Sequence, residues 1–180
     1  HPMLKKILAT LALIVVILVI VVAMQPADFR ITRTATIPAP PAAVFAQVND
    51  FHQWEAWSPW AELDPAAKNS FAGPAAGPGA KFTWAGNNEV GEGSMEIIES
   101  QPNDRILIDL KYVKPFEATS TAEFTFKPEG DQTVVTWSMS GSNGFIGKAM
   151  HLAMDCDKMV GGQFEKGLEK MKAEFASAKN

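Results

Sequence analysis

An uncharged apolar run near the N-terminus constrains this chain more than any other feature. Residues Ile7 to Met24 form an eighteen-residue stretch without a charge, and Thr10 carries its only hydroxyl group. As a helix rising about 1.5 Å per residue, this run would extend roughly 27 Å. That length is close to the hydrocarbon core of a bilayer, which is about 30 Å thick. We therefore expect residues 7–24 to form one transmembrane helix that stays attached as an anchor.

Two other structures are compatible with an apolar run of this kind. A cleaved signal peptide usually has a shorter apolar region, of about 7–15 residues, with small residues at the cleavage site. Here Met24-Gln25-Pro26 follows the run, and no cysteine is placed for lipoprotein processing. A buried core helix is rarely apolar on every side at a chain terminus. The pattern favours the anchor and leaves both alternatives open.

The charges that flank the run predict its orientation. Lys5 and Lys6 precede it, and positive charge beside a span tends to remain cytoplasmic. Arg30 and Arg33 on the far side weaken this bias. We expect a single-pass protein of the inner, cytoplasmic membrane, with its domain facing the periplasm or the cell exterior. His1-Pro2 before Met3 is interpreted as a remnant added ahead of the native start. This division gives an anchor with a short linker (1–28) and one domain (29–180).

The charge balance and the single cysteine exclude several classes of partner and cofactor. The chain has 16 basic and 20 acidic residues, so the part beyond the two anchor lysines has a net charge of about −6. With no basic run, this balance argues against nucleic-acid binding. Cys156 is the only cysteine, so an intramolecular disulfide is excluded. No Cys/His cluster has zinc spacing, and no cofactor motif is present, so we expect no metal and no cofactor. The sequence leaves the oligomeric state open.

The first third of the domain combines one strand with two short helices. Residues 29–38 alternate between a set containing Ile31 and Arg33 and a set of threonines, which predicts a strand. Pro41 suits the first turn of a helix that would close at Asn49-Asp50. Residues 51–60 then predict a short helix, broken at Pro59, that carries three tryptophans.

The middle of the domain predicts an antiparallel meander. Residues 65–78 are rich in Ala, Gly and Pro and are expected to form a loop. Strand patterns separated by short turns follow, and such consecutive strands usually pair with one another. The expected strands are 80–85, 91–100, 105–113, 118–127 and 132–140.

A long helical pattern ends the chain. Apolar residues recur at helical spacing between Phe145 and Ala176, which would extend about 48 Å if the helix were unbroken. Gly161-Gly162 lies in its middle, and each glycine costs roughly 1 kcal/mol relative to alanine there. A bend or a close approach to another element is therefore expected at this pair.

This order of elements resembles the START-like, or Bet v 1-like, helix-grip superfamily. Within it, the chain is similar to the bacterial polyketide cyclase/dehydrase and lipid-transport (SRPBCC) group. Three segments carry the resemblance: residues 38–45 (PAPPAAVF), 54–60 (WEAWSPW) and 162–172 (GQFEKGLEKMK). The resemblance implies an α+β helix-grip fold, in which a curved antiparallel sheet wraps around the long C-terminal helix. It also implies a cavity between the two that holds lipids, sterols, polyketides or other apolar molecules. The N-terminal span is a departure from many soluble relatives.

The alternation of the strands and the helical spacing indicate which side chains would line that cavity. The candidates are Trp84, Met95, Ile97, Phe124, Phe126, Trp137, Met139, Met150 and Met154. Methionine-rich linings can repack around varied apolar ligands. A closed core uses the same residue types, so the pattern leaves a cavity and a filled core as equal alternatives.

The tryptophan cluster and the histidines allow both functional and structural interpretations. Trp54, Trp57 and Trp60 could gate a cavity or touch a membrane surface, but a structural plug is favoured because tryptophan buries a large area. His52 and His151 are candidate general bases, and Asp155 follows His151 at one-turn spacing. A solvated surface pair is the favoured interpretation, and no catalytic residue is assigned.

Three functions follow from these patterns, in this order. The first is a membrane-tethered binding module for a hydrophobic or amphipathic small molecule such as a lipid. The second is a cyclase- or hydrolase-type enzyme that acts on such a ligand, with His52 or His151 as the base. The third is an envelope interaction domain without a ligand. Fold likeness does not choose among them, because such folds host unrelated activities.

Overall fold

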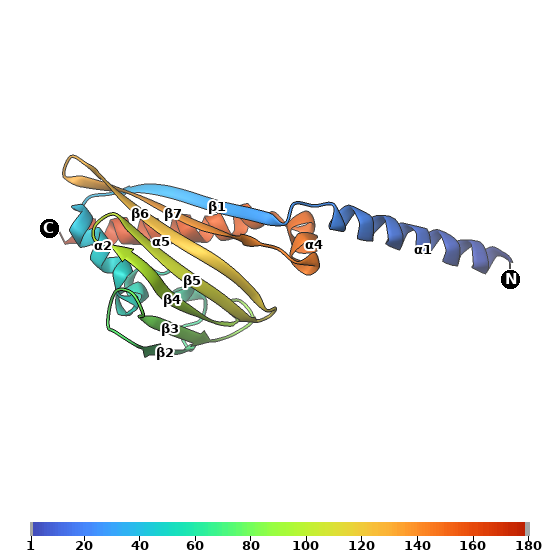
Figure 1. The fold of residues 1–180 in the computed structure, drawn as a ribbon, viewed down its shortest axis with the longest axis horizontal. Helices are drawn as coiled ribbons and strands as arrows, with labels where there is room; N and C mark the ends of the chain where they lie inside the picture. Colours follow the sequence, from blue (N-terminus) through green and yellow to red (C-terminus); the bar gives the residue numbers. More distant parts are fainter. Residues whose placement is uncertain (1, 179–180) are drawn as a thin grey trace.

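The computed structural model describes residues 2–178 as one long helix followed by a curved domain. His1, in the predicted segment 1–28, and residues 179–180, in the predicted segment 29–180, lie outside the described range. Helix α1 (Pro2–Ala23) projects away from the domain (Figure 1). Residues 2–21 of α1 are exposed, and Val22 is buried. Within residues 2–178, α1 is the one helix long and apolar enough to cross a membrane.

The domain is built on a seven-stranded antiparallel sheet in the order β1-β7-β6-β5-β4-β3-β2. The predicted meander is confirmed, with boundaries that differ by a few residues at most. The expected loop at 65–78 is wrong in part, because it contains β2, an edge strand whose five residues are all exposed. The strands are β1 (Asp28–Ile37), β2 (Lys68–Ala72), β3 (Lys81–Ala85), β4 (Glu92–Gln101), β5 (Arg105–Lys114), β6 (Ala118–Glu129) and β7 (Gln132–Ser142).

Four helical segments cover the concave face of the sheet. They are α2 (Pro41–Asn49), the 3-10 helix η1 (Phe51–Ala56), α3 (Trp60–Leu63) and α5 (Cys156–Ser177). The long α5 packs on β1, while α2 and η1 close the end of the concave face opposite α1 (Figure 1). Ile31, Val135 and Phe124 point into this space from three neighbouring strands and are buried there. The expected α+β helix-grip fold is therefore confirmed.

The C-terminal helical pattern is two helices instead of one. Helix α4 (Phe145–Ala153) ends where Met154 is extended, and α5 begins at Cys156. The side chain of Asp155 caps α5 by accepting a hydrogen bond from the Lys158 N–H at 3.0 Å. The single unbroken helix is therefore divided at Met154-Asp155, and α5 continues through Gly161-Gly162.

The expected close approach does occur at Gly161. A side chain added there would overlap the guanidinium of Arg33, which crosses from β1 to α5. Arg33 Nη2 lies 2.8 Å from Asp157 Oδ2, and Arg33 Nε lies 2.7 Å from Glu165 Oε1. The hydrogen bond from Arg33 holds the pKa of Asp157 below its usual value. This clamp fixes α5 along β1.

Candidate functional site

The space between the sheet and α5 is filled by aromatic rings, which we call the aromatic block. At its centre, Trp137 of β7 is stacked between Phe124 of β6 and Phe164 of α5, with ring centroids 4.9 and 4.0 Å away. Edge-on contacts with the three tryptophans of residues 54–60 complete the packing. The block consists of Trp54, Trp57, Trp60, Phe124, Trp137 and Phe164. It occupies the place where the resemblance implies a cavity.

The polar atoms of the tryptophan cluster are used within the fold. The indole N–H of Trp54 donates to the carbonyl of Val48 at 3.0 Å, and that of Trp57 donates to the carbonyl of Gln47 at 3.2 Å. Trp54 and Trp57 are both buried. A buried indole with its N–H satisfied by α2 stabilises the domain and has no donor left for a ligand. The geometry of this cluster is that of a structural plug.

The structure places the nine predicted lining residues in three different environments. Five lie in the buried core of the concave face: Ile97, Phe124, Phe126, Trp137 and Met139. Trp84 and Met95, on β3 and β4, are half-buried at its β2 edge. Met150 and Met154 lie on and just after α4, away from the other seven, and Met154 is exposed. The set is therefore not a single lining.

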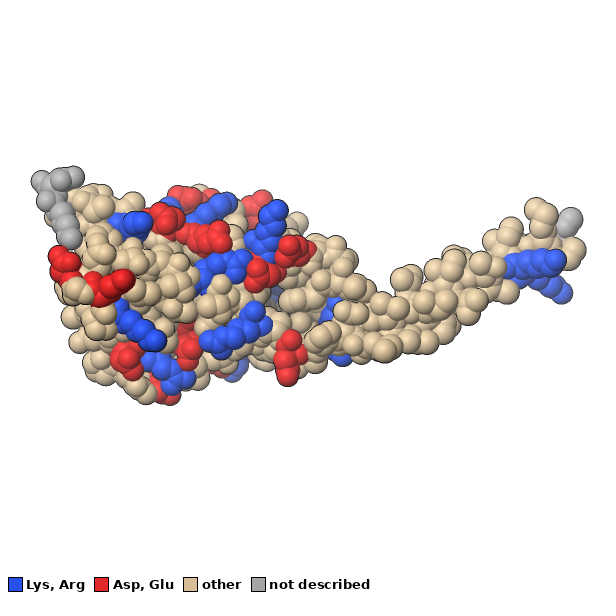
Figure 2. Space-filling model, turned by 90° about the horizontal axis from the view of Figure 1, so that it is seen from above, with Lys and Arg blue, Asp and Glu red and all other residues tan. Residues whose placement is uncertain are grey.

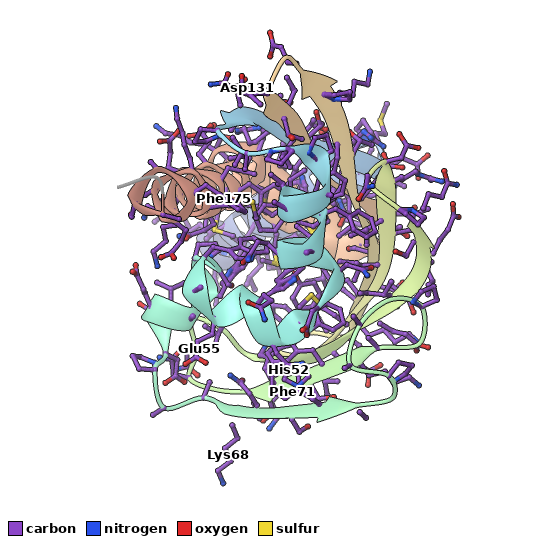
Figure 3. All side chains as sticks on the ribbon, turned by 90° about the vertical axis from the view of Figure 1, so that its left-hand side faces the viewer. His52, Glu55, Lys68, Phe71, Asp131 and Phe175 are labelled. Atoms are coloured by element: carbon purple, nitrogen blue, oxygen red, sulfur yellow. The ribbon has the colours of Figure 1, made fainter. Side chains whose placement is uncertain are left out.

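An open groove lies beside β2, at the same edge of the sheet as the half-buried Trp84 and Met95. This β2 groove has a volume of about 270 Å³. Its walls come from η1, from β2 and the loop after it, and from the start of β3. They are formed by Phe51, His52, Phe71, Ala72, Gly73, Pro74, Ala75, Ala80 and Lys81. Figure 3 shows His52 and Phe71 next to one another between η1 and β2, and their rings are stacked with centroids 4.0 Å apart.

His52, in the wall of the β2 groove, is paired with a carboxylate. His52 Nδ1 lies 2.7 Å from Asp50 Oδ1, and the same oxygen accepts the backbone N–H of His52 at 2.9 Å. If Nδ1 carries the proton of the neutral ring, Nε2 is left with a free lone pair. The pair can therefore act as a base, while its backbone bond also caps η1.

A row of aromatic rings connects the β2 groove with the predicted residues Trp84 and Met95. Phe71 contacts Phe82 at a centroid distance of 5.3 Å, and Phe82 is stacked on Trp84 at 6.1 Å. Phe82 is also paired with Met95 across β3 and β4. Tyr112 meets Trp84 edge-on at the far end, and burial raises the pKa of Tyr112 to about 12. Phe82, Trp84 and Tyr112 of this aromatic row are half-buried, and Phe71 at its start is exposed.

A second groove lies at the other side of the domain, between α2 and the end of α5. It has a volume of about 200 Å³ and is lined by Gln47, Trp57, Met171, Glu174, Phe175 and Ala178. We call it the α5 groove, and Figure 3 shows its Phe175 well away from His52 and Phe71. Glu174 gives this groove an acidic edge, whereas Lys81 at the edge of the β2 groove is paired with Glu96 at 3.3 Å.

The remaining candidates of the sequence do not form sites. The ring of His151 lies against Phe29, with centroids 5.3 Å apart. Within residues 2–178 no hydrogen bond or ion pair joins it to Asp155, which caps α5 instead. Burial, with the charge of Asp155 adding to it, raises the pKa of Cys156, which keeps that thiol protonated. The described part of the chain also brings together no group of three metal-ligating side chains.

Sequence reasoning did not identify Asp50 as the partner of His52, nor Phe71 and Lys81 as residues of the β2 groove. Asp50 could have been found, because an aspartate two residues before His52 is a common cap for a short helix. Phe71 is a single aromatic residue in a Gly/Pro-rich stretch, and Lys81 is one of many surface lysines. Neither has a pattern of its own, since the groove brings together segments that are far apart in sequence.

Comparison with known proteins identifies the domain. The family profile described as polyketide cyclase / dehydrase and lipid transport matches residues 28–176. The chain belongs to this family. The family binds hydrophobic ligands, including lipids. No significant match was found among curated proteins.

Solved structures show the same fold at low sequence identity. A protein from Nitrosospira multiformis has a TM-score of 0.61 at 18% identity, over 84% of this chain and 100% of its own. The Aha1 dimer from Colwellia psychrerythraea has a TM-score of 0.58 at 15% identity, over 82% and 96%. Ara h 8.0201 has a TM-score of 0.57 at 14% identity, over 83% and 99%. The fold of the whole domain in this member of the cyclase and lipid-transport family is thus shared by these three proteins.

Proposed function

We propose that this protein is a membrane-tethered module that binds a small hydrophobic or amphipathic molecule in the β2 groove. Residues 7–24, which include most of α1, form its single membrane span, with the N-terminus in the cytoplasm and the domain on the other side. The division into an anchor with linker (1–28) and a domain (29–180) is part of this proposal. The observation that carries it is an open groove with an aromatic wall, in a domain whose family binds hydrophobic ligands.

The lining of the groove favours a ligand with an apolar body and an acidic or acceptor end. Phe51, Phe71 and Pro74 supply apolar surface, while His52 and Lys81 supply polar atoms at the rim. Pockets for drug-sized molecules usually occupy about 300–1,000 Å³. At about 270 Å³, the groove suits one ring system or the end of one acyl chain. A longer ligand would continue over Phe82 toward Trp84 and Met95, which keeps two of the predicted residues in the proposed site.

The experiment uses the full chain in lipid nanodiscs and an anionic aromatic dye, 1-anilinonaphthalene-8-sulfonate. Phe71→Ala should weaken dye binding about fivefold, because an aromatic contact contributes about 1 kcal/mol and 1.4 kcal/mol corresponds to tenfold. Phe175→Ala is the matched control, since it removes the same side chain from the α5 groove. Unchanged affinity in Phe71→Ala would place the ligand elsewhere, and weakening only in Phe175→Ala would place it in the α5 groove.

Lipid extraction tests the same site without a dye. Nanodisc-free protein purified in mild detergent should release bound lipid or fatty acid on denaturation, as measured by mass spectrometry. Phe71→Asp should reduce that amount several-fold, because a carboxylate in the groove disfavours both an apolar chain and an acidic end. Equal amounts from both proteins would mean that the lipid is annular and that the groove is empty.

The His52–Asp50 pair favours an enzyme as a second candidate function. A base beside an apolar groove could activate water or a ligand hydroxyl group. Medium-chain p-nitrophenyl esters test hydrolysis directly. His52→Gln should abolish turnover if the pair is catalytic, whereas Phe175→Ala in the α5 groove should leave the rate unchanged. Equal rates in His52→Gln and the unsubstituted protein would reduce the pair to its role as a cap for η1.

A further inference from the structure

Helix α4 has an apolar face that nothing in the described chain covers. None of its nine residues is buried. Phe145, Ile146 and Leu152 are about half exposed, and Met154 just after the helix is exposed as well. At 100° per residue Phe145, Ile146 and Leu152 share one face with Ala149 and Ala153. His151 lies on the opposite face, and Lys148 lies at the flank of the apolar face, next to Leu152. An amphipathic helix of this kind normally buries its apolar face against something.

The position of α4 indicates what that surface is. It lies beside the end of α1 at which the domain begins (Figure 1). The ammonium group of Lys148 donates to the carbonyl of Ala23, the last residue of α1, at 3.1 Å. One residue before β1, the carbonyl of Ala27 accepts the Asn143 N–H at 2.7 Å, which fixes the short linker to the segment that leads into α4. The two helices are thus connected at two points.

The charges of the surface agree with this position. Figure 2 shows the charged side chains on the body of the domain and at the free end of α1, with an uncharged shaft between them. If residues 7–24 span the bilayer, Ala23 marks its surface, and Lys148 lies at the level of the headgroups. Amphipathic helices at this level bury their apolar face about 5–10 Å into the boundary between headgroups and acyl chains.

We propose that α4 docks on the lipid surface next to α1 as an interfacial helix. The inference rests on the proposed membrane span of α1. Phe145, Ile146 and Leu152 enter the interface, and Lys148 remains with the phosphates. Because His151 contacts Phe29 on the concave face, docking of α4 also sets which end of the domain faces the membrane.

Depth-dependent fluorescence quenching tests the proposal on the full chain. Cys156→Ser provides a background without thiols, in which single Val15→Cys, Leu152→Cys and Asp131→Cys variants carry the dye NBD. The proteins are reconstituted in phosphatidylcholine/phosphatidylglycerol vesicles with doxyl groups at shallow or deep acyl positions. Val15 reports on the span, Leu152 on α4, and Asp131 on the opposite end of the domain (Figures 1 and 3). Each labelled side chain is exposed, so all three variants should fold.

The expected result is strong quenching of Val15 by deep doxyl groups, strong quenching of Leu152 by shallow ones, and none at Asp131. Ile146→Asp should return the Leu152 probe to its emission in water. Quenching at Val15 without quenching at Leu152 would overturn the docking and leave the span intact. A blue-shifted but unquenched Leu152 probe would also overturn it, since a protein partner or a second copy would then cover α4. Absence of quenching at Val15 would overturn the span and the docking together.

Discussion

Helices α4 and α5 are neighbours in the chain, yet they relate to the sheet in opposite ways. Helix α5 is strongly charged, but it buries Phe164, Leu168 and Met171 under the sheet. Helix α4 is more apolar and buries no residue. Apolar content therefore does not decide which helix enters a core. What matters is whether the apolar face of the helix points to the sheet. Asp155 ends the run of α4 and starts α5 as a new helix, whose apolar face points to the sheet.

The largest difference in stability should come from replacing one phenylalanine in each of the two helices by alanine. Phe164→Ala removes a ring that is 2% exposed and stacked on Trp137, so it should lower the free energy of unfolding by about 3–5 kcal/mol. Phe145→Ala removes a ring that is 50% exposed and should change it by less than about 0.5 kcal/mol. Chemical unfolding of the full chain in detergent micelles measures both. Similar losses for the two variants would mean that α4 is part of the folded core.

The next effect concerns the close approach of β1 to α5. Gly161→Ala should destabilise the domain by about 1–2 kcal/mol relative to Gly162→Ala, because the new methyl group displaces Arg33 from its carboxylates. Nothing lies within 4 Å of a side chain at Gly162, so Gly162→Ala should stabilise α5 by up to about 1 kcal/mol. Thermal unfolding compares the two variants. Equal stabilities would show that Arg33 relocates without cost.

The smallest effect should be the pH dependence of the stability that the Arg33–Asp157 contact contributes. The pKa of Asp157 is lowered in the folded state by Arg33, so its contribution is present above about pH 3.8, the ordinary value, and is lost as pH falls below it. The carboxylate is largely exposed, which limits the contribution to less than about 1 kcal/mol. Asp157→Asn should therefore flatten the loss of stability between pH 4 and pH 2, relative to Asp131→Asn in the β6–β7 turn. Parallel acid-unfolding curves would exclude a role for the clamp.

The fold could be predicted where side chains follow a period. Alternation around Ile31 and Arg33 correctly predicted strand β1, and the favoured structural place of the three tryptophans agrees with their packing in the core. Strand β2 was missed because its residues lack the apolar alternation of a buried strand: all five are exposed at the sheet edge. The break before α5 was missed because Asp155 reads equally well as a surface partner of His151.

The candidate site could be predicted only in part, for a different physical reason. Alternation places Trp137 and Phe124 on the concave face, but it cannot show whether facing rings touch. Whether a cavity remains depends on the volumes of α2, η1 and α5 together, which no single segment contains. The β2 groove likewise joins His52, Phe71 and Lys81 from three segments. Their proximity is a property of the sheet order.

The close approaches at Gly161 and Gly167 also fix the position of α5 along its own axis. Arg33 occupies the space beside Gly161, and Pro59 and Trp137 come within 3.0 and 3.1 Å of a side chain placed at Gly167. Sliding α5 by one turn, about 5.4 Å, would bring Glu165 or Asp157 to the first position and Met171 or Gln163 to the second. Both positions would then clash. The packed helix therefore has only one axial register.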